Sequence, residues 1–291
     1  MLARRTLSLA LALTKGIGGK TVTKVLTRND LLGRSPDEFL TIGHEALIEE
    51  YGMSRAAAQS WTTNLSAWIN SVKAIEERLV SLGVQWITAA DAHYPQRIEQ
   101  VDHDPPGVLF LYGNSRLLES DSFCVLSSRN TSSRGLAAIE ALTERGVLDG
   151  KVLVSGHDKP EYQRSAVVPL RWGAPRVIVL DKGFFKALGE KLSEEPFRAA
   201  RLWRYQFDSK TDLAVSCMEP DKDYHPNSNK VRDRLVVGLS LAVNLVEVRP
   251  GGNMDKLARD ALNCGRPVRV CHWAEGAEQL LRIGAKTLDI D

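Results

Sequence analysis

The chain of 291 residues is longer than one small domain needs and fits two domains. Its hydrophobic content of 43% and charged content of 25% are ordinary for a globular protein, and no repeat or low-complexity segment is visible. The net charge of +2 neither requires nor excludes a nucleic-acid partner, so any basic binding surface would have to be local.

The four cysteines, Cys124, Cys217, Cys264 and Cys271, are widely spaced and form no Cys-x-x-Cys pair. This spacing argues against a zinc site. We therefore expect a reduced, cytoplasmic protein, and no metal or cofactor site is predicted.

Arg4 and Arg5 precede the short apolar run Leu7–Leu13, which imitates a secretion signal. The run lacks a small-x-small cleavage site and continues into Lys15–Gly18, so we interpret it as a helix of the folded protein. No stretch approaches the ~18 apolar residues of a membrane span, so no membrane partner is expected.

Residues 1–72 are predicted to form a small all-helical domain, and residues 73–291 a second domain. Helices are expected over Leu7–Leu13, Thr21–Leu26, Pro36–Leu40, Ile42–Tyr51 and Arg55–Lys73. Apolar residues recur every three or four positions along the last of these, which is typical of a helix with one buried face.

The segment Gly16-Ile17-Gly18 between the first two helices is typical of a helix-hairpin-helix motif. Gly16 and Gly18 would allow a tight turn and a close approach to a phosphate. Backbone N–H groups at the start of the second helix, with Lys20 and Thr21, would then bind a DNA backbone without reading its sequence. The alternative is a helical corner that binds no ligand.

The second domain is predicted to be a Rossmann-like α/β domain with a doubly wound, mostly parallel sheet. It begins with a helix over Ile75–Leu82 and strands over Val84–Ile87 and Val108–Tyr112. Later strands are expected over Phe123–Leu126, Lys151–Ser155, Arg176–Leu180, Leu213–Cys217, Ala242–Val248 and Val268–Cys271. The helices between and after them are expected over residues 135–145, 162–172, 184–192, 196–206, 230–239, 254–263 and 276–283.

The segment Phe123–Gly135, FCVLSSRNTSSRG, is the first candidate for chemistry. An apolar strand runs into small hydroxyl residues and then into a helix, a geometry that points backbone N–H groups at an anion. Arg129 in this turn would add guanidinium donors for a phosphate. An ordinary turn with a solvated arginine is an equally open interpretation.

Three other stretches could bind anions near this turn. Ser155-Gly156 ends another strand and could line the same sheet edge, where open α/β sheets bind ligands. Arg232 and Arg234 could both point into a cleft from the first turn of a helix. Gly251-Gly252, directly after Pro250, precedes a helix and is a further candidate anion loop.

Two polar stretches favour structural interpretations. His157 and Asp158 suggest acid–base chemistry, but no nucleophile stands beside them, so a polar loop is preferred. Arg198, Arg201 and Arg204 are interleaved with aromatic residues, which would suit single-stranded nucleic acid. A solvated arginine face with the aromatic rings packed inward is slightly preferred.

Several segments together resemble the DNA-processing protein A family, DprA/Smf. They are Tyr94-Pro95, Asp104-Pro105-Pro106, Tyr112-Gly113-Asn114, Leu126–Arg129, Ser155-Gly156 and Arg232–Ser240. The last is the most specific piece, because it is similar to the family's Arg-Asn-Arg-Ile-Ile-Ala-Gly-Leu-Ser. The resemblance spans nearly the whole chain, and residues 1–72 take the place of the helical N-terminal domain of many members.

The sequence departs from the family pattern around the expected pocket. Ser127 replaces the first glycine of the strand-end loop, and Arg134 replaces a tyrosine. After Ser155-Gly156 the family's small residues are replaced, with Asp158 among the new ones. Pro250-Gly251-Gly252 is closer to the Pro-Gly-Gly of nucleotide-processing relatives in the same superfamily.

The resemblance implies a protein that binds single-stranded DNA along a basic cleft and catalyses no reaction. It also implies a homodimer that loads a RecA-type recombinase in DNA recombination or natural transformation. We expect Arg129, Arg232 and Arg234 to grip phosphates. Further contacts are expected from Ser127, Ser128, Ser132, Ser155, Gly156, Gly251 and Gly252, and weaker ones from Gly16, Gly18, Lys20 and Thr21.

Two alternatives stay open at this point. The first is a Rossmann-like sensor of a small nucleotide, for instance in phage defence, which the Pro250-Gly251-Gly252 loop favours. The second is a hydrolase of a nucleotide N-glycosidic bond, which needs a carboxylate beside the sugar. Glu247 or Asp255 could supply that carboxylate, but neither has a visible partner.

Overall fold

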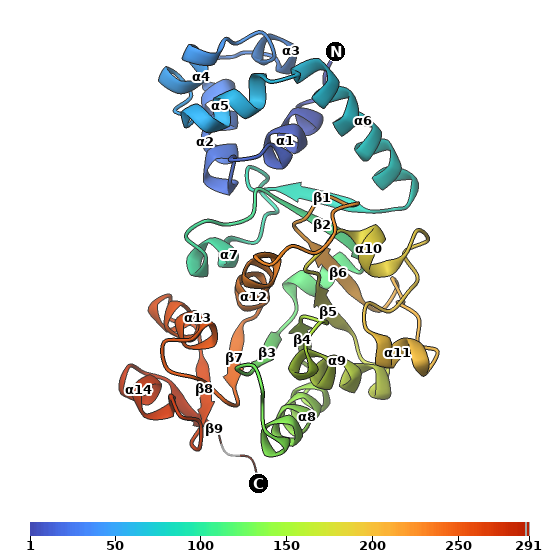
Figure 1. Ribbon diagram of the computed structural model, residues 1–291, viewed down its shortest axis with the longest axis vertical. Coiled ribbons are helices and arrows are strands. Elements are labelled where there is room, and N and C mark those ends of the chain that lie inside the picture. The colour runs from blue at the N-terminus through green and yellow to red at the C-terminus, as the bar shows by residue number, and fades with distance from the viewer. Residues whose placement is uncertain (289, 291) are drawn as a thin grey trace. The chain divides into compact units, whose positions relative to one another are not determined.

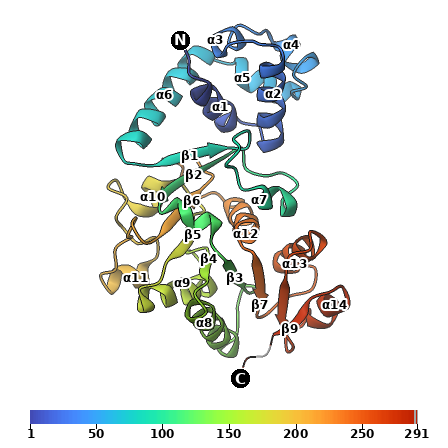
Figure 2. The same cartoon turned by 180° about the vertical axis from the view of Figure 1, so that it is seen from behind.

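The computed structural model describes residues 1–288 and 290. The chain divides into two compact units, one formed by residues 1–94 and 104–111 and the other by residues 95–103 and 112–291. Figures 1 and 2 show the chain from opposite sides. The domain boundary predicted after residue 72 falls inside a helix of the first unit.

The first unit is mainly helical, and its core includes the buried side chains of Leu9, Val25 and Trp61. Its helices are α1 (Arg4–Leu13), α2 (Gly19–Leu31), α3 (Pro36–Phe39), α4 (His44–Glu49), α5 (Arg55–Thr62) and α6 (Leu65–Ser81). Strand β1 (Gln85–Thr88) pairs in antiparallel fashion with the first residues of β2 (Val108–Gly113).

Local sequence signals explain where these helices begin and end. Ser35 and Glu38 form a capping box at the start of α3, in which the Ser35 N–H donates to Glu38 Oε2 at 2.7 Å. The single helix predicted over Arg55–Lys73 is wrong, because Asn64 adopts a left-handed conformation (φ 53°) that separates α5 from α6. Helix α6 then continues through most of Ile75–Leu82, which was predicted as a separate helix.

The second unit is built on a parallel sheet. Within residues 112–288 its strands are β3 (Ser122–Leu126), β4 (Val152–Ser155), β5 (Arg176–Val179), β6 (Leu213–Ser216), β7 (Ala242–Leu245), β8 (Val268–Cys271) and β9 (Lys286–Leu288). They lie in the order β6-β5-β4-β3-β7-β8-β9, and each neighbouring pair is parallel. This confirms the predicted doubly wound sheet. Strand β9 was not predicted, because it is short and mostly exposed.

Helices cover both faces of this sheet (Figures 1 and 2). They are α7 (Gln96–Val101), the 3-10 helix η1 (Ser115–Glu119), α8 (Ser133–Leu148), α9 (Pro160–Trp172), α10 (Phe184–Leu188), α11 (Arg198–Leu202), α12 (Ser228–Leu239), α13 (Asn253–Asn263) and α14 (Ala277–Arg282). Successive side chains of β3 point to opposite faces of the sheet and so pack against the helices on both faces. Phe123 and Val125 join a buried cluster under α8, whereas Cys124 contacts Ser240 just after α12.

Two helices are shorter than predicted. Gly189, with φ +74°, follows the end of α10, which was expected to reach residue 192. Arg204 lies beyond α11 with φ +62°, so Arg201 and Arg204 do not share a helix as expected. Among the described residues, none of the helices combines the length and the apolar character needed to span a membrane.

The chain order of the strands reverses between β3 and β7. Strand β3 pairs with β4 on one side and with β7 on the other. Ligands of open α/β sheets bind outside the carboxyl ends of the strands at such a switch point. The loops after β3 and β7 are directly joined there, because the Ser128 N–H donates to the Glu247 carbonyl at 2.7 Å.

Candidate nucleic-acid interface

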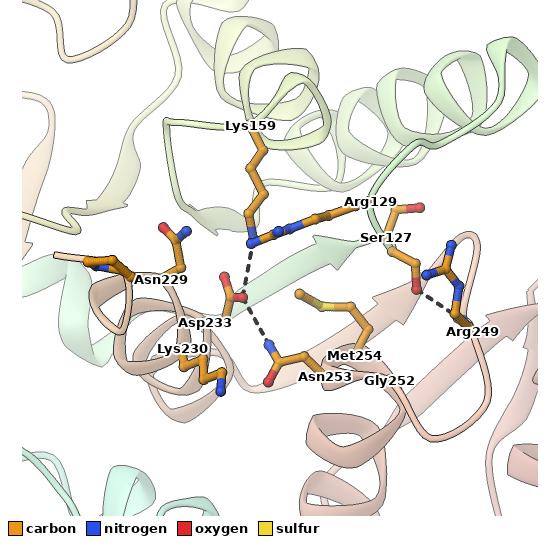
Figure 3. Close-up of a pocket in the computed structure, with 12 residues that line it drawn as sticks. Ser127, Arg129, Lys159, Asn229, Lys230, Asp233, Arg249, Gly252, Asn253 and Met254 are labelled. Atoms are coloured by element: carbon orange, nitrogen blue, oxygen red, sulfur yellow. Dashed lines mark hydrogen bonds and ion pairs between the residues drawn. The ribbon is translucent and has the colours of Figure 1, made fainter. Parts of the chain in front are cut away.

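A pocket of about 330 Å³ lies at this switch point (Figure 3). It is formed by the loop after β3, the loop before α9, the first half of α12, and the loop that leads from β7 into α13. Its lining residues are Ser127, Ser128, Arg129, Lys159, Pro226, Asn229, Lys230, Asp233, Arg249, Gly252, Asn253 and Met254. Residues far apart in the sequence are thus brought to one sheet edge.

Basic side chains from four separate segments line this pocket. They are Arg129, Lys159, Lys230 and Arg249. Among the residues that the structure describes, no carboxylate pairs with the side chains of Arg129, Lys230 or Arg249, and all three are exposed. The Lys159 ammonium lies 3.4 Å from Asp233 Oδ2, and Figure 3 shows Lys159 and Arg129 extending toward the same region. The pocket therefore offers uncompensated positive charge to an anion.

Asp233 organises the floor of the pocket. Its Oδ1 accepts hydrogen bonds from the Tyr162 hydroxyl and from Arg232 Nε, both at 2.8 Å. Its Oδ2 accepts from Asn253 Nδ2 at 3.0 Å and faces Lys159 (Figure 3). Arg232 and Lys159 flank the buried Asp233 carboxylate and neutralise its charge. Asp233 therefore orients lining side chains without making the pocket acidic.

Arg232 does not grip a phosphate as the sequence suggested. Its side chain is completely buried and forms ion pairs with Asp158 and Asp233. Its guanidinium also lies 4.5 Å from the centre of the Tyr162 ring. Burial by itself lowers the pKa of Arg232, but Tyr162 and the two carboxylates raise it well above its ordinary value. The residue is a structural cation that Asp158 and Asp233 hold inside the protein.

Arg234 is also engaged within the protein. Its Nε donates to Asp102 Oδ2 at 2.8 Å, and its side chain is about one-third exposed at 34%. It does not line the pocket. Arg129 is therefore the member of the predicted arginine trio that the structure leaves available, and the expectation of three gripping arginines is corrected to one.

The turn after β3 also differs from the expectation. The Ser132 N–H donates to Glu247 Oε2 at 3.0 Å, and the Ser132 hydroxyl contacts the other oxygen of that carboxylate. Ser132 Oγ also accepts from the Gly135 N–H at 3.0 Å and so caps α8. The N–H and hydroxyl of Ser132, predicted to bind a ligand anion, thus bind the Glu247 carboxylate of the same chain. Ser127 and Ser128 still line the adjacent pocket.

Ser155 and Gly156 lie below the surface and do not line the pocket. The Ser155 hydroxyl is buried without a hydrogen-bond partner among the described residues. A Cβ on Gly156 would lie 2.5 Å from Arg232 Nη1, so glycine is needed here for packing and not for ligand approach. His157 belongs to the same buried layer, with Nε2 3.1 Å from Asp181 Oδ1.

The two glycines after β7 have different roles. Gly252 lines the pocket and precedes α13. Gly251 adopts φ +69°, and its N–H donates to Asp255 Oδ2 at 3.0 Å. Asp255 also accepts from Arg259 Nε at 3.2 Å. This carboxylate is therefore committed to the turn and to its own helix.

The glycine hairpin joins α1 to α2, with Gly16 at φ +85°. Other residues of the first unit contact the start of α2. The Gly19 N–H donates to the Pro105 carbonyl at 3.0 Å, and a Cβ on Gly18 would lie 2.7 Å from Asp104 Oδ1. Lys20 is exposed and Thr21 half-buried.

Sequence reasoning missed eight of the twelve lining residues. Lys159, Asn229, Lys230, Arg249 and Asn253 line it without having been predicted as site residues. A signal existed for two of them. Lys230 lies two positions before Arg232, the first residue of the family-like segment Arg232–Ser240. Arg249 directly precedes the Pro250 loop.

The chain was compared with known families and proteins. The model of the family described as DNA recombination-mediator protein A matches residues 85–290. No curated protein sequence matches significantly. A solved structure of DNA processing protein A from Streptococcus pneumoniae is similar with a TM-score of 0.72 at 20% identity, covering 98% of this chain and 93% of that chain.

A second similar structure is DNA processing protein A from Helicobacter pylori, described for its single-stranded DNA binding mode. Its TM-score is 0.53 at 19% identity, with 70% of this chain and 90% of that chain covered. Both structures agree with the fold expected from the resemblance. The family match covers most of the chain and agrees with the expectation of a non-enzymatic protein. The chain belongs to the DNA recombination-mediator protein A family.

Proposed function

We propose that this protein binds single-stranded DNA through the switch-point pocket and catalyses no reaction on it. The observation that carries the proposal is the set of basic side chains from four segments around one pocket. Arg129, Lys230 and Arg249 have no carboxylate partner among the described residues and are exposed. Cations of this kind neutralise backbone phosphates without reading sequence.

The positions that would suit a compact phosphate group are occupied by the protein itself. Asp158 pairs with Arg232, and Glu247 takes the N–H of Ser132 at the start of α8. The remaining cations line the pocket with exposed side chains, which suits contact with a polymer backbone. The relative from Helicobacter pylori, described for its single-stranded DNA binding mode, supports the same choice of ligand.

A sensor of a small nucleotide is the second candidate. It is favoured by the pocket volume of about 330 Å³, which lies in the range of small-molecule sites. Hydrolysis of a glycosidic bond is not proposed. Glu247 accepts hydrogen bonds from Ser132, and Asp255 accepts from Gly251 and Arg259, so both carboxylates serve the local structure.

The finer expectations rest on the family resemblance. We propose that the protein forms a homodimer in the cytoplasm and helps to load a RecA-type recombinase on single strands, in recombination or natural transformation. A helix-hairpin-helix contact through Gly16, Gly18, Lys20 and Thr21 would be a second, weaker attachment to the DNA backbone. Size-exclusion chromatography with light scattering tests the dimer directly.

Binding of a labelled oligothymidylate to the full chain, measured over a range of salt concentrations, tests the proposal. The logarithm of affinity should fall linearly with the logarithm of salt, by ~0.7 for each phosphate neutralised. R129A/R249A should weaken binding and reduce this slope by ~1.4. The matched control R116A/K186A removes the same charge from exposed positions outside the pocket.

Unchanged affinity and slope in R129A/R249A would show that DNA binds elsewhere or not at all. Thermal stabilisation by a mononucleotide panel, without oligonucleotide binding, would select the sensor instead.

A further inference from the structure

A second cluster of aromatic and basic side chains lies beyond the pocket. Arg134 stands in the first turn of α8, and His272 and Trp273 directly follow β8. The Arg134 guanidinium carbon is 3.9 Å from the centre of the Trp273 ring. The His272 ring meets the Trp273 ring edge to face, with centroids 5.1 Å apart and an interplanar angle of 87°. A guanidinium is thus stacked on an indole that a second ring supports.

This cluster packs against the protein core on one side and is exposed to solvent on the other. Trp273 packs against the buried apolar cluster under α8, whereas Arg134 and His272 are exposed. Within the part of the chain that the structure describes, Arg134 has no ion pair or side-chain hydrogen bond. Its N–H donors are therefore available, and its guanidinium carbon lies over the indole.

The cluster and the pocket share one edge of the sheet. The pocket is built from the loops after β3 and β7, and β8 is the next strand beyond β7. Two strand spacings, about 10 Å, separate the ends of β3 and β8. The contact between Ser132 and Glu247 fixes the start of α8 over the end of β7. Arg249 follows β7, the strand that lies between β3, which precedes Arg129, and β8, which precedes His272.

We propose that Arg134, Trp273 and His272 form a stacking platform for an unpaired nucleobase. The platform would hold a second nucleotide of the strand whose phosphates bind the pocket cations, so the inference rests on the proposed function. Unpaired bases stack on aromatic rings and on guanidinium planes, and the free guanidinium N–H groups can bind the adjoining phosphate. A duplex would not use the platform, because its bases are stacked inside the helix.

Two probes separate the platform from the pocket. A thymidine dinucleotide is short enough to occupy the pocket alone, whereas a decathymidylate reaches both sites. R134K keeps the positive charge and removes the planar guanidinium. It should weaken decathymidylate binding by ~5- to 100-fold, the range of one lost stacking contact, with the dinucleotide affinity and the salt slope nearly unchanged.

Tryptophan fluorescence provides a second readout. A decamer of 5-bromodeoxyuridine should quench the wild-type protein on binding, and W273F should lose most of that quenching. The matched control W172F removes an indole that is 52% exposed on another part of the unit, and its quenching should stay.

Wild-type decathymidylate affinity in R134K, or wild-type quenching in W273F, would overturn the platform. If the wild-type protein bound neither probe, the proposed function itself would fail, and the platform with it. R134K changes an exposed side chain, so this variant should fold normally. It therefore keeps the test decisive even if W273F fails to fold.

Discussion

Arg129 and Arg232 were expected to do the same work, but they stand in opposite environments. Arg129 lines the switch-point pocket, is exposed, and pairs with no carboxylate among the described residues. Arg232 has no exposed side-chain surface and is paired with Asp158 and Asp233. The first is free to exchange water for a ligand phosphate. The second would have to break buried ion pairs before it could bind anything.

The difference shows that an arginine's role depends on which carboxylates the fold brings to it. A buried guanidinium requires paired charges, because its desolvation is otherwise very costly. Asp158 and Asp233 meet that requirement, and Asp233 in turn orients Lys159 and Asn253 in the pocket. In the proposed function Arg232 would therefore act indirectly, as a positioning residue beneath the pocket.

The largest expected effect comes from removing the buried cation. Arg232→Met should lower the free energy of unfolding by ~3–5 kcal/mol, because the buried Asp233 would lose its closest cation and Asp158 would lose its ion-pair partner. Urea denaturation measures the loss. Arg249→Met, at an exposed pocket position, should change stability by less than ~0.5 kcal/mol and reduce DNA binding instead. An R232M protein as stable as wild type would contradict the contrast between the two arginines.

A smaller effect is expected where a carboxylate occupies the start of α8. Glu247→Ala should cost ~1 kcal/mol of stability, because the N–H and hydroxyl of Ser132 lose their acceptor. The vacated position should then bind inorganic phosphate, which would raise the melting temperature of the variant. Glu247→Gln keeps an acceptor oxygen and serves as the control. If phosphate stabilised wild type, E247Q and E247A equally, the carboxylate would not be blocking an anion site.

The smallest expected effect is the pH dependence of the buried layer. Burial raises the pKa of Asp181, but the contact with His157 and the charges of Arg232 and Lys182 outweigh it, so the pKa is lowered. A carboxyl group with a lowered folded-state pKa adds stability above its unfolded pKa of ~3.9, and this is lost as pH falls through the folded value. The stability difference between wild type and Asp181→Asn should therefore be constant above about pH 5 and shrink as the pH falls below about 4. Denaturant titrations at several pH values measure it, and a difference that does not change with pH would argue against this ion pair.

Much of the fold could be predicted from local patterns. Apolar runs of four or five residues marked β3 to β8, and their alternation with helices predicted the doubly wound sheet. The errors lie where one residue's backbone conformation decides the outcome. Asn64 splits the helix expected over residues 55–73, and Arg204 interrupts the one expected over residues 196–206. Side-chain periodicity carries no signal for such left-handed positions.

The site was predicted only in part. The loops after β3 and β4 were expected at one sheet edge, with Gly251-Gly252 as a further anion loop. Arg129 and Gly252 do line a shared pocket, whereas Ser155 and Gly156 do not. Lys159 and Lys230 were missed, because an isolated lysine in a loop or on a helix looks like ordinary surface. Arg232 was misread, because a family-like arginine next to a pocket suggests contact with the ligand.

The sequence by itself determined most of the succession of strands and helices and the family, and it predicted one sheet edge as the ligand site. These follow from hydrophobic periodicity and short motifs, which are local properties of the chain. Only the tertiary structure decided which charges are available. Asp158 reaches Arg232 across 74 positions, and Glu247 reaches Ser132 across 115. Such pairings depend on how distant loops come together in the fold. They decide why Arg232 is buried and paired whereas Arg129 is exposed.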